Sequence, residues 1–272
     1  MHGCGNDYIY VNAFTESVSD PAAAAIRLSD RHFGIGGDGL VLIRPSEQAD
    51  FFMDMYNADG SRSEMCGNAI RCVGKYVHDR GLTDKTVLTI ETLAGIKTLW
   101  LTLENGSVRT VRVNMGHPRF HAHDIPVASN SHRFFHQPVE VGGETWEIHA
   151  VNTGNPHGVI VCDDPDALPL EQIGPVLEHH PYFPERANIE FIRVLDRRTI
   201  QMRVWERGSG ETLACGTGAC ASVAIAVGLG LTDTNVDVRL KGGTLHIDWD
   251  NVQEGMFMTG PAEFVFDGEV DI

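Results

Sequence analysis

The stretch Glu-Met-Cys-Gly-Asn-Ala at residues 64–69 decides how this chain of 272 residues is organised, because a related stretch, Leu-Ala-Cys-Gly-Thr-Gly, stands at residues 213–218. Their cysteines, Cys66 and Cys215, lie 149 residues apart, and the same interval separates Gly-Asn at 5–6 from Gly-Asn at 154–155. The recurring residues serve chemistry and backbone geometry rather than general burial. The pattern therefore indicates an internal duplication that presents one thiol from each half.

Each half combines one long helical pattern with many short strand-like stretches. We expect leading helices at Asn68–Arg80 and Thr217–Val227, further helices at Pro21–Asp30 and Pro175–His180, and a last strand at Ala262–Phe266. Wide apolar faces on the leading helices are typical of helices enclosed by their own domain. The fold class is therefore expected to be α+β, with two pseudo-symmetric domains, each a mostly antiparallel sheet wrapped around a central helix, and the active site in the cleft between them.

The boundary between the halves is expected near His117-Pro118, where a strand-rich region gives way to a polar, histidine-containing stretch. This divides the chain into an N-terminal half, residues 1–117, and a C-terminal half, residues 118–261. The final segment, residues 262–272, is a candidate to return to the first half.

Composition excludes several classes of partner. The 37 acidic residues outnumber the 21 basic ones, and a net charge of −16 repels nucleic acid and anionic membranes. The sequence has no apolar run near the roughly 20 residues of a membrane span, and its N-terminus has no signal-peptide pattern. We expect a cytoplasmic protein, whose six cysteines stay reduced.

Cys66 and Cys215 each precede a predicted helix, where the positive end of the helix dipole is expected to lower the pKa of a thiol. Cys72 and Cys220 follow them at spacings of six and five, which point the paired thiols away from each other and give no zinc ligand spacing. A redox dithiol normally shows Cys-x-x-Cys, which is absent from the sequence. That alternative stays open only if Cys66 and Cys215 meet.

Two thiols that face each other suit racemisation or epimerisation, because a thiolate on one side removes a proton while a thiol on the other delivers one. The sequence has four lysines, none in an evident motif for a pyridoxal cofactor. The paired helix ends can instead hold an α-carboxylate and stabilise the charge that develops on deprotonation. We therefore predict no cofactor and no metal. The backbone N–H groups expected to hold the carboxylate are those of Gly67, Asn68, Gly216 and Thr217.

The chain resembles the diaminopimelate epimerase family over nearly its whole length. The motifs that carry the resemblance lie at residues 1–8, 34–39, 56–71, 154–157, 185–191 and 205–218, and include Met-His-Gly-Cys-Gly-Asn-Asp-Tyr, Gly-Asn-Pro-His and Trp-Glu-Arg-Gly-Ser-Gly-Glu-Thr-Leu-Ala-Cys-Gly-Thr-Gly. The resemblance implies a cofactor-independent isomerase that interconverts LL- and meso-2,6-diaminopimelate for lysine and peptidoglycan precursor biosynthesis. It also implies a homodimer that binds a small-molecule amino-acid substrate.

The resemblance also implies roles for individual residues. Cys66 and Cys215 are expected to be the catalytic pair, with support from His157 and Glu206 in setting the protonation states of the thiols. Arg207 is expected to bind the distal carboxylate, for which a bidentate guanidinium is well suited. The remaining substrate-binding residues that the resemblance implies are Asn6, Asn57, Gly67, Asn68, Asn155, Asn188, Glu206, Gly216 and Thr217.

The sequence departs from the family pattern in places. It begins at Met-His-Gly, where members usually have several earlier residues that form a first strand, so we expect a shortened N-terminus. Ala69, Arg62 and Gly39 stand where glycine, an acidic residue and, in some members, glutamine are common, and Gly39 leaves a substrate contact there open. Cys4 is expected to be a buried structural thiol.

Three other readings explain less of the sequence. Proline and hydroxyproline racemases also use two cysteines but typically have histidine where this chain has Asn68, and phenazine-biosynthesis isomerases lack the thiol pair. A non-catalytic thiol switch or metal-storage protein would explain the cysteines but not the asparagines and Arg207.

Overall fold

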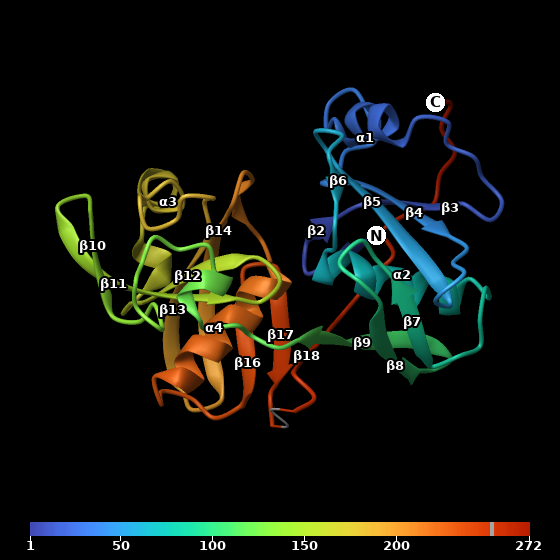
Figure 1. The fold of residues 1–272 in the computed structure, drawn as a ribbon. Coiled ribbons are helices and arrows are strands. Elements are labelled where there is room, and N and C mark those ends of the chain that lie inside the picture. The colour runs from blue at the N-terminus through green and yellow to red at the C-terminus, as the bar shows by residue number, and fades with distance from the viewer. Residues whose placement is uncertain (251–252) are drawn as a thin grey trace. The chain divides into compact units, whose positions relative to one another are not determined.

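The fold is described from a computed structural model that covers residues 1–250 and 253–272. The chain divides into two compact units, the first formed by Met1–Asn114 with Thr259–Ile272 and the second by Met115–Met258. Both units mix abundant strand with a few helices, which confirms the expected α+β class (Figure 1). Among the described residues, no helix has the length and apolar character needed to traverse a membrane. The α-helices are α1 (Pro21–Ser29), α2 (Gly67–Asp79), α3 (Leu170–Glu178) and α4 (Gly216–Gly228).

The first unit is built on a mixed sheet with the strand order β9-β8-β7-β5-β4-β3. Parallel pairs (β3 with β4, β5 with β7) alternate with antiparallel pairs (β4 with β5, β7 with β8), and β6 adds to β5. Two residue pairs at the N-terminus form a separate small sheet, β1 with β2. The strands are β1 (His2–Gly3), β2 (Asn6–Asp7), β3 (Ile9–Asn12), β4 (Gly39–Arg44), β5 (Phe51–Asn57), β6 (Arg62–Ser63), β7 (Val87–Glu91), β8 (Lys97–Glu104) and β9 (Ser107–Gly116).

The second unit has the strand order β10-β11-β12-β13-β14-β16-β17, and β15 adds to β14. Its strands are β10 (Gln137–Val141), β11 (Glu144–Asn152), β12 (Pro156–Val161), β13 (Asn188–Asp196), β14 (Thr199–Glu206), β15 (Gly210–Thr212), β16 (Asn235–Leu240) and β17 (Gly243–Asp248). The chain passes between the units along β9 and again along β18 (Met256–Gly260).

The strand pairing repeats between the units with the offset found in the sequence. The pair Leu40–Tyr56 of β4 and β5 recurs 149 positions later as the pair Ile189–Trp205 of β13 and β14. Along β12, β13, β14, β16 and β17 the pairs are parallel, antiparallel, parallel and antiparallel, the same order as along β3, β4, β5, β7 and β8. In each unit a short strand, β6 or β15, leads directly to the cysteine and then to the long helix. The two units are therefore versions of one folding pattern.

The long helix of each unit is buried by its own strands. Residues Gly67–Lys75 of α2 are all buried, and α2 packs on β8 and on the small β1–β2 sheet. Nearly all of α4 is buried, and it contacts β11, β12, β13, β14, β16 and β17 (Figure 1). The cysteine that precedes each helix is therefore held by a rigid, enclosed element.

Two expected elements differ in the structure. The helix placed at Pro175–His180 begins at Leu170 and ends at Glu178, with Pro175 inside it, because Leu170, Ile173 and Leu177 insert into the core of the second unit. Burial of these side chains stabilises a helix that continues through Pro175, although proline is more common at a helix start.

The strand expected at Ala262–Phe266 is not formed. Only Glu263 pairs there, in an isolated bridge with His2, and Phe266 is 64% exposed. The segment is instead fixed to the first unit by side chains, since Arg80 binds the carboxylate of Asp267 and lies 4.5 Å from the centre of the Phe264 ring.

Candidate active site

Cys66 is the N-cap residue of α2. Its backbone is extended, and its Sγ accepts a hydrogen bond from the Ala69 N–H at 3.5 Å. The thiol donates to Oδ1 of Asn6 at 3.4 Å, and Nδ2 of Asn6 donates to Oδ2 of Asp38 at 2.7 Å. Burial and the neighbouring Asp7 carboxylate raise the pKa of Asp38. Asp38 thus fixes which end of the Asn6 amide faces the thiol.

Arg71 stabilises the first turn of α2 through hydrogen bonds. It is fully buried, and the sequence did not single it out. Its guanidinium donates to Gly67 O at 3.0 Å and to Oδ1 of Asn68 at 2.9 Å. It also donates to Pro261 O at 3.2 Å and approaches Cys4 Sγ at 3.8 Å. Cys4 is buried, as expected, and it supports this arginine rather than lying in a purely apolar setting.

Asn57 lies at the end of β5, and its Nδ2 donates to Ser61 Oγ at 3.0 Å. Glu206 stands 149 positions later at the end of β14, so the duplicated fold puts an amide in one unit where it puts a carboxylate in the other. The two units therefore present related but unequal polar groups.

Cys215 is the N-cap residue of α4 and repeats the geometry of Cys66. Its Sγ accepts from the Gly218 N–H at 3.4 Å and lies 3.4 Å from Oγ1 of Thr217. Thr217 O accepts from the Thr153 hydroxyl at 2.9 Å, which ties the helix start to the loop before β12. Both thiols thus occupy helix N-termini, as the sequence indicated.

The pKa of Cys215 is raised well above its usual range, chiefly by burial and then by the carboxylates of Glu206 and Glu190. The Thr217 hydroxyl and the Gly218 N–H oppose this shift but do not cancel it. The expectation that the helix end lowers the thiol pKa is therefore wrong for Cys215, because burial and the two carboxylates outweigh the hydrogen bond from the Gly218 N–H at the helix start. These surroundings favour the thiol form of Cys215 over the thiolate.

Glu206 lies next to Cys215 and hydrogen bonds with it. Burial raises the pKa of Glu206, while hydrogen bonds from Thr212 and Cys215 work in the opposite direction. Thr212 Oγ1 lies 2.5 Å from Oε1 of Glu206, which fixes the carboxyl group beside the thiol. A carboxyl group with a raised pKa beside a thiol suits proton exchange with that thiol.

His157 is fully buried in β12, and both of its ring nitrogens face oxygens. Nδ1 lies 2.7 Å from Oε1 of Glu190, and Nε2 lies 2.7 Å from Oδ1 of Asn155. Glu190 was missed by the sequence reading, although a lone carboxylate in the apolar run Asn-Ile-Glu-Phe-Ile at 188–192 is a usable signal. A Cβ at Gly218 would lie 2.6 Å from the same oxygen of Glu190, so any other residue there would require this carboxylate or the helix start to shift.

Asn188 and Arg207 are joined by a hydrogen bond. Oδ1 of Asn188 accepts from the Arg207 N–H at 3.0 Å, and its Nδ2 donates to Pro156 O at 3.1 Å. Asn188 is buried, whereas the exposed guanidinium of Arg207 touches Glu185 O at 3.3 Å. Asn188 thus fixes the start of the loop that carries Arg207.

One group of side chains within residues 1–250 and 253–272 has metal-like spacing, formed by His136, Glu147 and His149. Nδ1 of His149 accepts the backbone N–H of His136 at 3.2 Å, so the neutral ring carries its hydrogen on Nε2, which faces Glu147 at 3.4 Å. A ligating histidine normally donates from the nitrogen that does not bind the metal. The group is therefore a hydrogen-bonded His-Glu cluster.

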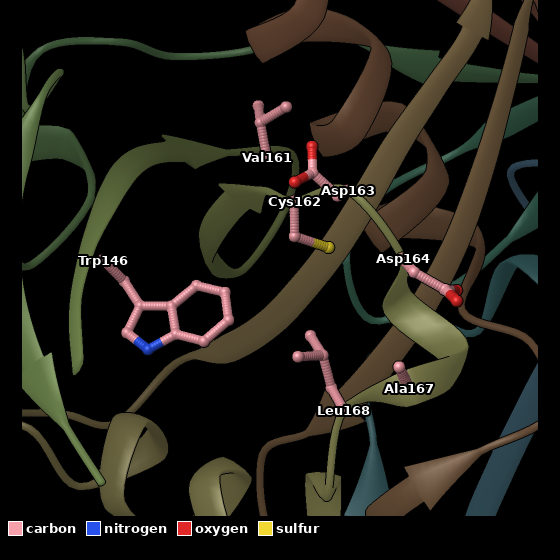
Figure 2. A pocket seen from close by; sticks show the side chains of 7 residues that line it. All are labelled: Trp146, Val161, Cys162, Asp163, Asp164, Ala167 and Leu168. Atoms are coloured by element: carbon pink, nitrogen blue, oxygen red, sulfur yellow. The ribbon is translucent and has the colours of Figure 1, made fainter. Parts of the chain in front are cut away.

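A hollow of about 440 Å³ lies elsewhere in the second unit and contains none of the residues discussed above (Figure 2). Burial, followed by Asp163 and Asp164, raises the pKa of its thiol, Cys162, to about 11. Cys162 is therefore a poor nucleophile at neutral pH. The hollow is lined by Trp146, Val161, Cys162, Asp163, Asp164, Ala167 and Leu168.

Comparison with solved structures shows the fold. A phenazine biosynthesis protein of the PhzF family from Bacillus anthracis has a TM-score of 0.72 at 20% identity, covering 100% of this chain and 95% of that one. A probable proline racemase from Agrobacterium radiobacter, with bound carbonate, has a TM-score of 0.65 at 15% identity, covering 98% and 92%.

Sequence comparison is more specific. A diaminopimelate epimerase from Acetivibrio thermocellus is 56% identical over 100% of this chain and 97% of that protein. One from Methanococcus maripaludis is 52% identical over 100% and 98%. The family model described as diaminopimelate epimerase matches residues 1–121 and 149–265. With both cysteine-headed helices inside the matched regions, the chain belongs to the diaminopimelate epimerase family of isomerases.

Proposed function

We propose that this chain interconverts LL- and meso-2,6-diaminopimelate by moving a proton at the α-carbon between two cysteines. Its family membership supports the substrate, and the matching positions of Cys66 and Cys215 at helix N-termini support the chemistry. One cysteine acts as thiolate and removes the α-hydrogen, while the other acts as thiol and delivers a proton to the opposite face. The roles exchange in the reverse direction.

The two helix starts also suit the carboxylate at the reacting carbon. Each cysteine sulfur accepts the N–H of the third helical residue, Ala69 or Gly218, and the earlier N–H groups of a helix have no acceptor within the helix. We propose that these earlier N–H groups bind the carboxylate and stabilise the negative charge of the deprotonated substrate. They belong to Gly67, Asn68, Gly216 and Thr217.

The protonation states around Cys215 support an acid role for it in one direction. Its pKa is raised by burial and by two carboxylates, so a thiol is the stable form before the reaction. We propose that Glu206 and His157 help the thiols exchange protons with their surroundings between turnovers. Arg207, on an exposed loop, is proposed to bind the distal carboxylate, with Asn6, Asn57, Asn155 and Asn188 completing the polar contacts.

The reaction is proposed to need neither pyridoxal nor a metal. Lys75, the most enclosed of the lysines that the structure describes, binds Asp79 at 2.8 Å and Val108 O at 2.7 Å, so its amine has a structural task. Placement in lysine and peptidoglycan precursor biosynthesis, a cytoplasmic location and a homodimer are proposed on family grounds.

The test is proton NMR of the reduced protein with LL-diaminopimelate in D₂O, following loss of the α-hydrogen signal and appearance of the meso isomer. We expect exchange with epimerisation, and a loss of at least about 10²-fold in rate for Cys66→Ala and for Cys215→Ala. Cys162→Ala, which removes a thiol from the separate hollow, is the matched control and should keep full activity. An inactive wild-type protein, or a cysteine-to-alanine variant at position 66 or 215 with full activity, would contradict the proposal.

A further inference from the structure

Glu190 is a buried carboxylate with few hydrogen-bond partners. Both Glu190 and His157 are fully buried, and Oε1 of Glu190 lies 2.7 Å from Nδ1 of His157. Its other oxygen, Oε2, is buried and has no hydrogen-bond partner among the described residues. An ionised carboxylate in such a place is stable only beside a strong donor or a positive charge. His157 is the group that can supply either.

The strand register brings this pair together. In the parallel pair β12–β13, Glu190 stands opposite Val159, and His157 is two residues before Val159 on the same face. Asn155 closes the other side of the ring, since its Oδ1 lies 2.7 Å from Nε2. Both contacts are hydrogen bonds when both ring nitrogens carry hydrogen, because Oε1 of Glu190 and Oδ1 of Asn155 can only accept. When Nε2 loses its hydrogen, the Asn155 amide must turn so that its Nδ2 faces the ring.

The first unit shows that the fold itself does not need this pair. The positions 149 residues before His157 and Glu190 are Tyr8 and Val41, which lie in the corresponding strand region and in the corresponding strand β4. Val41 is fully buried, so an apolar side chain fills the equivalent place in the duplicated sheet. A buried acid and histidine retained in only one unit are better explained by chemistry than by packing.

We propose that Glu190 is a positioning residue of this enzyme, which keeps a proton on Nδ1 of His157 so that Nε2 is the nitrogen that exchanges protons in the reaction. The inference rests on the proposed epimerase function. A carboxylate bound to one imidazole nitrogen fixes the tautomer and leaves the other nitrogen for chemistry. Two further titratable groups of the described residues interact with this pair: Glu206 on β14 interacts electrostatically with His157 and Glu190, and Cys215 at the start of α4 interacts with Glu190.

The proposal also gives Glu190 an electrostatic effect on the second thiol. Its carboxylate raises the pKa of Cys215, after the larger effects of burial and Glu206. Oε1 of Glu190 is close enough to the helix start that a side chain at Gly218 would collide with it. One carboxylate thus orients the histidine and favours the thiol form of the neighbouring cysteine.

The test is two-bond ¹H–¹⁵N NMR of protein with ¹⁵N-labelled histidine, which shows which ring nitrogen carries hydrogen. The His157 signals are assigned by their absence from the spectrum of His157→Gln. In the wild type we expect Nδ1 to carry a hydrogen at neutral pH. Glu190→Gln keeps the size of the side chain but loses its charge, so we expect the hydrogen to leave Nδ1 in a large part of the molecules. We also expect kcat to fall by about 10²-fold or more, with KM changed by less than about threefold.

Glu147→Gln is the matched control, because Glu147 also faces a histidine Nδ1, that of His136 at 2.9 Å, but lies on the β10–β11 hairpin. It should leave both the His157 signals and kcat unchanged. A wild-type His157 without hydrogen on Nδ1, or a Glu190→Gln protein with unchanged kcat, would overturn the proposal. The NMR result does not require turnover, so it separates failure of this inference from failure of the epimerase assignment. If Glu190→Gln does not fold, the wild-type spectrum and Glu190→Asp, expected to retain the Nδ1 hydrogen, still decide it.

Discussion

Replacing Arg71 with methionine should destabilise the first unit and disturb the start of α2. Methionine keeps most of the apolar stem but removes the guanidinium, which donates to oxygens of Pro261, Gly67 and Asn68 at 3.2, 3.0 and 2.9 Å. Hydrogen bonds from a charged donor contribute about 1.5–3 kcal/mol each, so the gross loss is about 5–9 kcal/mol. Removing a buried charge also recovers several kcal/mol of desolvation. We therefore expect a net loss of about 3 kcal/mol.

Thermal unfolding followed by circular dichroism measures this loss. For a chain of this size a change of 1 kcal/mol moves Tm by about 2–4 °C, so Arg71→Met should lower Tm by about 6–12 °C. Arg109→Met is the control in the same unit, because Arg109 is 64% exposed and its carboxylate contacts are 3.6 and 3.9 Å long. An exposed pair of this kind contributes about 0–1 kcal/mol.

A second measurement is kcat of Arg71→Met at a temperature where this variant is fully folded. Because Arg71 holds the oxygens of Gly67 and Asn68 directly after Cys66, we expect kcat to fall at least about tenfold, equivalent to about 1.4 kcal/mol. If Arg71→Met and Arg109→Met unfold within 1 °C of each other and share the same kcat, the buried guanidinium does not have the role described here.

Three further changes test other parts of the structure. Asp38→Asn should lower kcat about tenfold in the NMR epimerisation assay without unfolding the protein, because Asn6 loses its charged acceptor; unchanged kcat would contradict this. Gly218→Ala should lower kcat and cost about 1–3 kcal/mol in urea unfolding, since its Cβ would meet Glu190 at 2.6 Å; a wild-type urea midpoint would show that the carboxylate moves aside freely. Burial lowers the pKa of His149 to about 4, below its unfolded value near 6.5, so its contribution to stability is complete above pH 6.5 and is lost as the pH falls towards 4. The urea midpoint of His149→Gln should fall less than that of the wild type between pH 7 and pH 4, and parallel curves would contradict the shift.

The elements nearest the cysteines were the most predictable. The helices expected at 68–80 and 217–227 are observed at Gly67–Asp79 and Gly216–Gly228. Glycine helps to define the end of the first, because Gly81 adopts a positive φ of 71° just after the helix. Short strands such as β6 and β15 were not predicted, because two or three residues are too few to show the alternation of apolar and polar side chains that marks a strand.

The same reasoning missed two charged residues of the site, Arg71 and Glu190. Charged side chains are normally exposed, so an arginine inside a helix is read as a solvent-facing residue. Arg71 is fully buried because the C-terminal segment folds over it and offers Pro261 O, a contact 190 residues away in the chain. Glu190 left a clearer signal in its apolar strand, but its partner His157 becomes visible only once β12 and β13 are paired.

The duplicated fold explains why the two thiols need not be equivalent. Both units place a cysteine at the N-terminus of a buried helix, and in both the asparagine of the matched Gly-Asn dipeptide stands 60 positions before that cysteine. The surroundings then diverge at matched positions, where Tyr8, Val41 and Asn57 correspond to His157, Glu190 and Glu206. At these matched positions the second unit therefore carries an imidazole and two carboxyl groups where the first carries a phenol, an aliphatic side chain and an amide. The two-cysteine reaction proposed above needs one thiolate and one thiol at the start of each turnover. Unequal surroundings of two equivalent helix ends would provide that bias, which a perfectly symmetric pair would lack.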